Sequence, residues 1–116
     1  MANIKVDEVI GRVPTRLYVN GEWRDSSNGE TFTVINPATE EKLADVASAT
    51  PEDGMAALDA AVAAQREWAR TPSRKRAQIL WDAFDRVVEL KDDFAAVMTA
   101  EMGKPLDQAC GEVAYG

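Results

Sequence analysis

The second half of the chain carries apolar residues spaced three and four positions apart, which is the period of an α-helix with one buried face. Thr50-Pro51-Glu52-Asp53 begins the first such segment with a helix-capping residue, a proline suited to the first turn, and two acids that favour the positive end of the helix dipole. This helix should run to about Arg70. Its apolar positions are Met55, Leu58, Val62, Trp68 and Ala69.

Two further helices are expected next. Thr71-Pro72 repeats the start signal, and the helix after it should end before Asp92-Asp93, where another begins. The apolar positions of the first of these two are Ala77, Leu80, Phe84, Val87 and Val88. The second should end at Gly103, because glycine readily takes the left-handed conformation that ends a helix.

A fourth helix should follow the break at Gly103-Lys104-Pro105, with Pro105 in its first position. Its apolar stripe consists of Leu106, Ala109, Cys110, Val113 and Ala114. This stripe is still running at Gly116, and no capping residue follows it. We therefore expect the sequence to be the first part of a longer chain.

Alternation of apolar and polar residues in the first half predicts short β-strands. Asn20-Gly21 lies between Leu17-Tyr18-Val19 and Glu22-Trp23, and this pair is typical of a two-residue hairpin turn that needs positive φ at both positions. Two more strands are expected over residues 31–35 and 42–48. Together these segments predict one small antiparallel sheet of three or four strands.

Strands followed by about four helices place the chain in the α+β class. Residues 1–13 precede the sheet as an N-terminal arm, either with a turn or two of helix or without regular structure. Residues 14–116 contain all the predicted strands and the four predicted helices. A sheet of this size is marginal alone, and we expect Trp23, Trp68 and Trp81 to anchor the packing of sheet and helices.

Charge and composition argue against several classes of function. The 116 residues carry a formal net charge of −7, which disfavours nucleic-acid binding because phosphate contacts depend on lysine and arginine. The sequence has no histidine, the commonest general base and zinc ligand. No apolar run approaches the ~20 residues of a membrane-spanning helix, and the N-terminus has no apolar core of signal-peptide length. We expect a cytoplasmic protein without a nucleic-acid or membrane partner.

Cys110 is the single cysteine and the one obvious nucleophile in the sequence. It shares an apolar helical stripe with Ala109 and Val113, and no base lies near it in sequence. A small buried apolar residue is therefore a better interpretation than a catalytic thiolate. A single cysteine also gives neither an internal disulfide nor a thiolate metal cluster.

Two sets of basic residues could meet an anion. Lys104 lies at the break between the last two helices, where a solvated lysine is the simpler interpretation. Arg74-Lys75-Arg76 puts three cations in the first turn of a helix, where the dipole disfavours them. An exposed basic turn is the simpler account of these three, and compensation by an acidic surface elsewhere or in another subunit is the alternative.

Four segments, taken in order, resemble the N-terminal segment of the aldehyde dehydrogenase superfamily. They are Leu17-Tyr-Val-Asn-Gly-Glu-Trp23, Phe32-Thr-Val-Ile-Asn-Pro-Ala-Thr-Glu40, Trp68 with Thr71-Pro-Ser-Arg74, and Glu101-Met-Gly-Lys-Pro-Leu106. Each is a weak signal alone, but four in register over residues 14–116 are a strong one. The last segment, followed by Gly111-Glu-Val-Ala-Tyr-Gly116, is most similar to the NAD(P)-dependent succinate-semialdehyde dehydrogenase branch.

The resemblance implies a larger α/β fold, in which residues 14–116 are the incomplete N-terminal part of the cofactor-binding domain. It implies oxidation of succinate semialdehyde, or of a similar short semialdehyde, to the acid with NADP or NAD. In that family a cysteine thiolate attacks the aldehyde, hydride passes to the nicotinamide, and a glutamate-activated water releases the acid. Complete relatives are dimers or tetramers.

The same resemblance locates the family's catalytic and dinucleotide-binding motifs downstream of this segment, and Cys110 does not match the nucleophile motif. No catalytic, cofactor-binding or metal-binding residue is therefore assigned, and no cofactor is expected to bind these 116 residues alone. Some relatives bind a monovalent cation, and the nearest positions here are the main chain of Val34-Ile35 and the side chain of Glu112. An exposed helical glutamate is the preferred account of Glu112, since a lone acid seldom marks a hard-cation site.

Two hypotheses follow. In the preferred one, the chain is the N-terminal fragment of a succinate-semialdehyde dehydrogenase-like enzyme and is inactive alone. In the alternative, it is a free-standing α+β module that binds a partner protein through exposed helix stripes, without catalysis. A self-sufficient module should cap its last helix and bury its apolar stripes, whereas a fragment leaves both undone.

Overall fold

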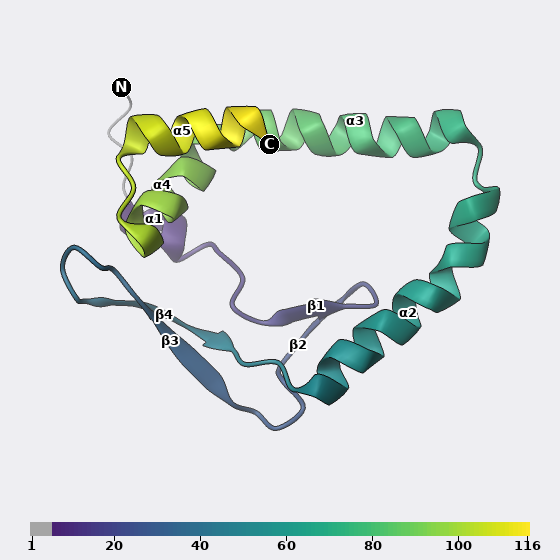
Figure 1. Ribbon diagram of the computed structural model, residues 1–116, viewed down its shortest axis with the longest axis horizontal. Helices are drawn as coiled ribbons and strands as arrows, with labels where there is room; N and C mark the ends of the chain where they lie inside the picture. The colour runs from purple at the N-terminus through teal and green to yellow at the C-terminus, as the bar shows by residue number, and fades with distance from the viewer. Residues whose placement is uncertain (1–5) are drawn as a thin grey trace.

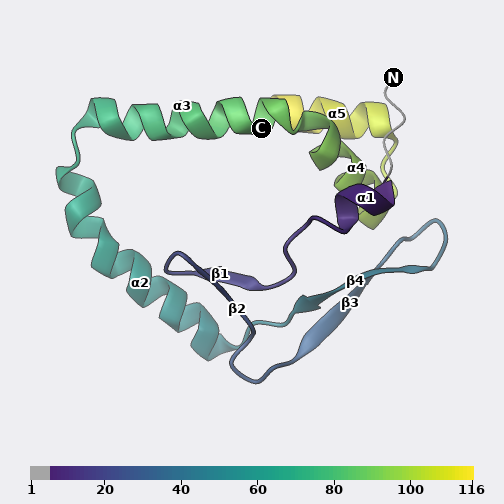
Figure 2. The same ribbon diagram turned by 180° about the vertical axis from the view of Figure 1, so that it is seen from behind.

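The computed structural model describes residues 6–116, which form an open, roughly triangular frame (Figure 1). One side is α2 (Pro51–Arg70), and a second is α3 (Ser73–Glu89) with α5 (Leu106–Tyr115) in line with it, while α4 (Lys91–Met102) runs at an angle from that side toward α1. Two β-hairpins make the third side, and the same open middle is seen from behind (Figure 2). The frame extends over 47 × 38 × 19 Å, so its thickness allows no more than about two layers of helix.

The predicted strands are present, but the prediction of one sheet was wrong, because they form two separate antiparallel pairs. The strands are β1 (Leu17–Val19), β2 (Glu22–Arg24), β3 (Thr31–Ile35) and β4 (Lys42–Ala47). Asn20 and Gly21 have φ of 53° and 82°, which confirms the predicted hairpin turn. Between the hairpins, Ser26 Oγ donates a hydrogen bond to the Glu30 carbonyl at 2.8 Å.

The predicted start of α2 is confirmed. Its capping hydrogen bonds belong to a larger network than the sequence indicated. Thr50 Oγ1 accepts a hydrogen bond from the Asp53 backbone N–H at 3.2 Å, and the Asp53 carboxylate accepts from the Thr50 N–H at 3.0 Å. The same carboxylate accepts from the Ser27 N–H at 3.0 Å and pairs with Arg24 Nη2 at 2.9 Å. Asp53 is only 3% exposed, and its carboxylate joins β2, the turn after it and the first turn of α2.

The four helices predicted after residue 50 are all present, but some of their boundaries differ from the prediction. Thr71 ends α2, because its Oγ1 donates to the Glu67 carbonyl at 3.0 Å, whereas α3 begins at Ser73 without a side-chain cap. The prediction of Thr71 as a start signal was therefore wrong. Gly103 ends α4 with φ of 76°, as predicted, and Pro105 lies one residue before α5 instead of at its first position. Within residues 6–116, no helix is both long and apolar enough to span a bilayer.

The predicted arm contains α1 (Val6–Ile10), a short helix that packs against α4 and buries Val9. Residues 1–5 of that arm lie outside the described part of the chain. The Arg12 guanidinium pairs with Asp93 at 3.1 Å and adds a polar link between the chain after α1 and α4.

The buried residues among those described are small. Ala95, Ala96 and Ala100 of α4 and Ala109 of α5 are at most 3% exposed, and no large side chain of residues 6–116 is fully buried. The small side chains let α4 and α5 approach closely, and these two helices form the most extensive helix contact of the frame. The core therefore lies at one corner, where α1, α4 and α5 meet.

The expectation that three tryptophans anchor the packing was wrong. Trp23, Trp68 and Trp81 are 50%, 44% and 60% exposed. The physical reason is that α3 has no buried residue and makes no extensive contact with another described element, and α2 contacts little beyond β1. Large aromatic side chains on these helices therefore have no opposing layer.

Replacing Asp53 should test its role as the link between hairpin and helix. The backbone N–H groups of Thr50 and Ser27 hold the pKa of Asp53 below its usual range. A lowered pKa means that Asp53 stabilises the fold fully above the unfolded-state pKa, near 4, and loses this effect as pH falls through the folded-state pKa. We expect Asp53→Asn to melt at a lower temperature than wild type at pH 7, with the difference shrinking below about pH 4.

Thermal loss of the helical circular dichroism signal at both pH values measures this effect. Asp59→Asn is the matched control, because Asp59 is an exposed carboxylate on the same helix. An unchanged pH 7 melt for Asp53→Asn would contradict the proposed linkage.

A second substitution tests the alanine-lined corner. Ala109→Leu adds three carbons where no space is exposed, and overpacking of this kind costs about 1–3 kcal/mol. Ala114→Leu, at an exposed position of the same helix, should change stability by no more than about 0.5 kcal/mol. Thermal unfolding followed by circular dichroism compares the two, and equal effects would show that close packing of α5 is not required.

Candidate functional site

Two of the segments singled out in the sequence meet where the turn after β3 reaches the break between α4 and α5. Gly103 has a φ of 76°, which favours glycine, and a Cβ atom added there would lie 3.3 Å from Pro37 Cγ, a tighter contact than most. The turn is closed by Asn36, whose Oδ1 accepts from the Ala38 N–H at 2.9 Å and whose N–H donates to the Glu41 carbonyl at 2.9 Å. This contact joins the second hairpin to the helical corner.

A partly polar hollow of about 340 Å³ lies beside this contact. Its lining comes from α1, the β3–β4 turn and α4, and includes Asp7, Asn36, Glu41, Lys42, Thr99 and Gly103. The buried Oγ1 of Thr99 has no hydrogen-bond partner within the described chain. The hollow can take water or a small polar group, and no thiol lines it.

Lys104 differs from its prediction. Its ammonium forms an ion pair with Glu112 on α5, and the Lys104 side chain is only 20% exposed, so the interpretation as a solvated lysine was wrong. Glu112 remains half exposed, in agreement with the preferred account of an exposed helical glutamate. The sequence did not reveal the pair because the helix break brings together two residues eight positions apart, outside the usual helical spacings.

The residues named for a monovalent-cation site are in different surroundings. Val34 lines a hollow with Val97 and Glu101, Ile35 is 51% exposed, and the Glu112 carboxylate is paired with Lys104. Across residues 6–116, no group of three or more Cys, Asp or Glu side chains is arranged to hold a metal ion. The cation site at Val34-Ile35 and Glu112 stays the untested alternative to the preferred account of an exposed glutamate.

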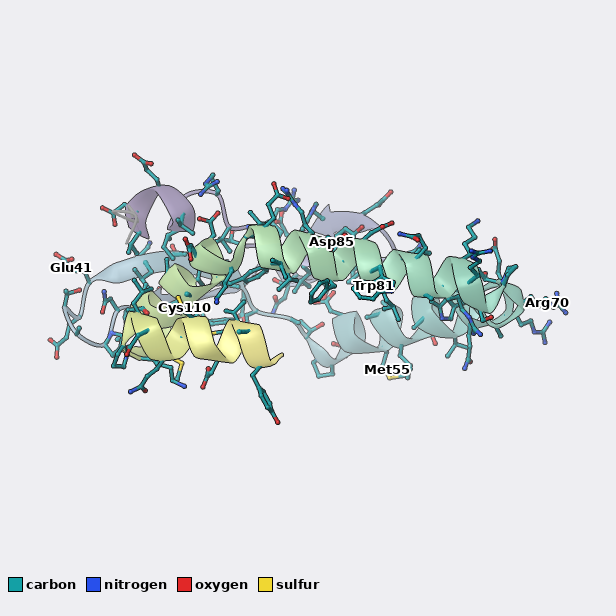
Figure 3. The ribbon with its side chains drawn as sticks, turned by 90° about the horizontal axis from the view of Figure 1, so that it is seen from above. Glu41, Met55, Arg70, Trp81, Asp85 and Cys110 are labelled. Atoms are coloured by element: carbon teal, nitrogen blue, oxygen red, sulfur yellow. The ribbon has the colours of Figure 1, made fainter. Side chains whose placement is uncertain are left out.

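Cys110 is a free thiol on α5, labelled in Figure 3, and it is half-buried. The prediction of a small buried apolar residue is thus confirmed in part. Neither of the hollows described above includes Cys110 in its lining.

Cations gather where α2 meets α3, at the end of the frame marked by Arg70 in Figure 3. Arg74 and Lys75 are exposed and Arg76 is half-buried, so the interpretation as an exposed basic turn holds for the first two. No described acid pairs with any of the three. The first turn of α3 also lacks a side-chain cap.

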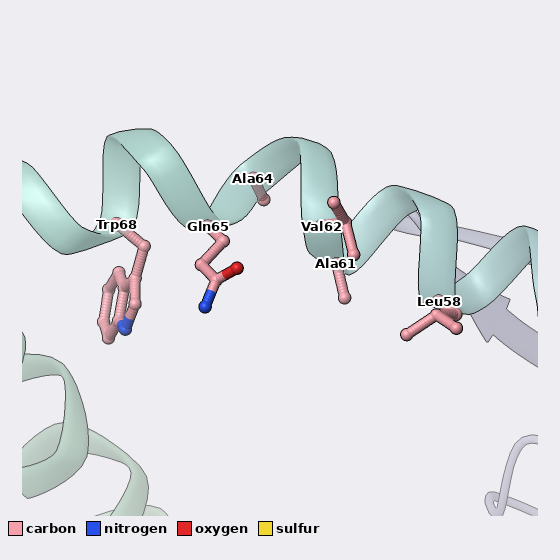
Figure 4. Close-up of a pocket in the computed structure, with 6 residues that line it drawn as sticks. All are labelled: Leu58, Ala61, Val62, Ala64, Gln65 and Trp68. Atoms are coloured by element: carbon pink, nitrogen blue, oxygen red, sulfur yellow. The ribbon is translucent and has the colours of Figure 1, made fainter.

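Large apolar side chains are exposed on both α2 and α3. We define the α2–α3 apolar surface as Leu58, Val62, Trp68, Leu80, Trp81 and Phe84, each between 44% and 67% exposed. On α2, Leu58, Gln65 and Trp68 border an open hollow to which no other element contributes (Figure 4). On α3, the rings of Trp81 and Phe84 meet edge to face, with centroids 5.4 Å apart. Such a surface can bind apolar groups and carries no group for acid–base or nucleophilic chemistry.

The apolar stripes of both helices were identified from the sequence, and the fragment hypothesis predicted that they would not be buried. Their exposure in the structure agrees with that prediction. The small sheet cannot cover the apolar faces of two helices of 20 and 17 residues.

This chain is similar in sequence to proteins of a known family. Residues 23–116 match the sequence profile of the aldehyde dehydrogenase family. The chain is 64% identical over 74 residues to succinate-semialdehyde dehydrogenase of Paenarthrobacter nicotinovorans, covering 64% of this chain and 16% of that protein. It is 43% identical over 97 residues to the NADP(+) succinate-semialdehyde dehydrogenase GabD of Escherichia coli K12, covering 84% of this chain and 20% of GabD.

Solved structures share the frame itself. Betaine aldehyde dehydrogenase of Staphylococcus aureus in complex with NAD+ superposes with a TM-score of 0.90 at 28% identity, over 94% of this chain and 22% of that one. Succinate-semialdehyde dehydrogenase of Burkholderia pseudomallei gives 0.87 at 36% identity, over 98% and 23%. The chain thus spans about a fifth of the length of the relatives that it matches. By its sequence and its fold, it belongs to the aldehyde dehydrogenase family.

Proposed function

We propose that this chain is the N-terminal part of the cofactor-binding domain of an NAD(P)-dependent aldehyde dehydrogenase that oxidises succinate semialdehyde, or a similar short semialdehyde, to the acid. The observation that carries the proposal is the 64% identity to a succinate-semialdehyde dehydrogenase over 74 residues. A glutarate-semialdehyde dehydrogenase of Pseudomonas putida, 41% identical over 100 residues, supports the wider class of short semialdehydes.

The residues described here fit a supporting role and not a reacting one. Neither the partly polar hollow beside Gly103 nor the α2–α3 apolar surface offers a glycine-rich turn at a helix start, the usual cradle for a dinucleotide phosphate. No reaction step is therefore assigned to a residue of this chain. When bound to the complete enzyme, the nicotinamide cofactor accepts the hydride from the aldehyde carbon.

In this proposal, the chain contributes structural support to the enzyme and takes no part in the reaction. The Asp53 network holds the first hairpin against α2, and the Pro37–Gly103 contact holds the second hairpin against the helical corner. Together they fix the frame on which the remainder of the enzyme would be built. Cytoplasmic location and assembly into dimers or tetramers stay predictions of the same proposal.

The activity prediction uses the chain alone and in a chimera. We expect the 116 residues, incubated with succinate semialdehyde and NADP or NAD, to give no rise in absorbance of the reduced cofactor above a protein-free blank. A chimera, in which this chain replaces the matching first fifth of E. coli GabD, should oxidise succinate semialdehyde, because the two segments share 43% identity.

Betaine aldehyde, offered to the same chimera, is the substrate control. Turnover by the 116 residues alone would contradict the proposed supporting role. A folded chimera that uses neither cofactor would contradict the assignment to this enzyme.

A further inference from the structure

A basic segment joins α2 to α3 in a chain that is otherwise acidic. Residues 60–81 contain five cations and a single acid, Glu67, so this segment carries a net charge of +4. The rest of the 116 residues has eight cations against 19 acids, a net charge of −11. We define the α2–α3 basic corner as the five cations of the segment, which are Arg66, Arg70, Arg74, Lys75 and Arg76.

The basic corner occupies two adjoining helix ends, because only residues 71 and 72 separate α2 from α3. Arg66 and Arg70 are four residues apart, so they lie on the same side of α2 about one turn from each other. Arg74 and Lys75 follow in the first turn of α3. These four residues are all exposed, and nitrogen-bearing side chains extend from the end of the frame marked by Arg70 in Figure 3. The corner therefore presents four cations to solvent.

The basic corner differs from the other cations of the described chain in having no acid partner. No acid of residues 6–116 forms an ion pair with any of its five members, and the α3 members lie at the end of the helix dipole that disfavours cations. An anion from outside the described chain would relieve this repulsion. Outside the corner, by contrast, six described cations do form ion pairs with acids, namely Arg12, Arg16, Arg24, Lys42, Arg86 and Lys104.

Charge and size indicate an acidic protein segment as the partner of this corner. Three of its four exposed cations are arginines, whose planar fork of N–H donors pairs with a carboxylate through two parallel hydrogen bonds. A short acidic segment in an extended chain spans ~3.3 Å per residue, so it can cover the corner without meeting the acidic remainder. A nucleic-acid duplex or a membrane surface is larger than the corner and would also be repelled by the net charge of −11 elsewhere in the chain.

We propose that the α2–α3 basic corner is a docking site for an acidic segment of another protein, with Arg70, Arg74 and Lys75 as its main contacts. The inference goes beyond the proposed function and does not depend on it, because the docking site takes no part in the oxidation of an aldehyde.

The test is binding of a fluorescently labelled peptide of about ten glutamates, roughly 33 Å long when extended, measured by fluorescence anisotropy. We expect the 116-residue chain to bind this peptide at low ionic strength and not to bind a peptide of the same length made of glutamine. Replacing Arg70, Arg74 and Lys75 together by glutamine should weaken binding at least ~10-fold, because three ion pairs are lost. Salt at ~1 M should also weaken binding to the wild-type chain, because it shortens the screening length to ~3 Å.

Arg16→Gln with Lys42→Gln and Arg86→Gln is the matched control. It also removes three exposed cations and changes the net charge equally, but each of these cations already pairs with an acid of the chain. This control should bind the glutamate peptide nearly like wild type, because exposed charges far from the peptide are largely screened. Circular dichroism of each purified variant checks that its helices remain.

Three results would overturn the proposal. Absence of peptide binding at low ionic strength, or an equal loss in both triple variants, would show that the corner is not a docking site. Tighter binding of a single-stranded oligonucleotide of the same charge, or of vesicles that contain phosphatidylserine, through the same three residues would make phosphate groups the ligand. A dimer of the wild-type chain in light scattering that separates when these residues are replaced would make a second copy the occupant.

Discussion

Within residues 6–116, no second layer covers α2 and α3, and the structure of this part of the chain depends on that constraint. Burial of a Leu or Phe side chain stabilises a fold by about 1.5–3 kcal/mol, and most such side chains on these helices remain exposed. The residues that reach full burial are chiefly alanines at the corner of α1, α4 and α5. A frame 19 Å thick offers few positions at which a larger side chain could be enclosed.

Polar contacts hold the frame where apolar burial does not. Asp53 is the clearest case, because one carboxylate accepts from two backbone N–H groups and pairs with Arg24 across two elements of secondary structure. The Lys104–Glu112 pair bridges the break before α5 in the same way. These contacts set angles between elements, whereas an apolar core would supply most of the stability.

Family membership explains why such an open shape is retained. The solved relatives keep it within chains four to five times as long, so the exposed stripes need not be stable surfaces in a complete enzyme. At Gly103, which has no side chain, Pro37 of the turn after β3 lies close to the end of α4. Two of the family-like segments, those that contain Pro37 and Gly103, thus lie close to each other.

The sequence by itself determined the local structure of this protein. The hairpin at Asn20-Gly21, the cap at Thr50 and the end of α4 at Gly103 depend on short-range φ preferences and neighbouring hydrogen bonds, which nearby residues specify. The resemblance to the family was also visible in the order of its motifs. Only the tertiary structure decided that the strands form two sheets, that Trp81 is exposed, and that Lys104 meets Glu112. These depend on which elements lie side by side, and an apolar stripe looks the same in sequence whether its partner is present or not.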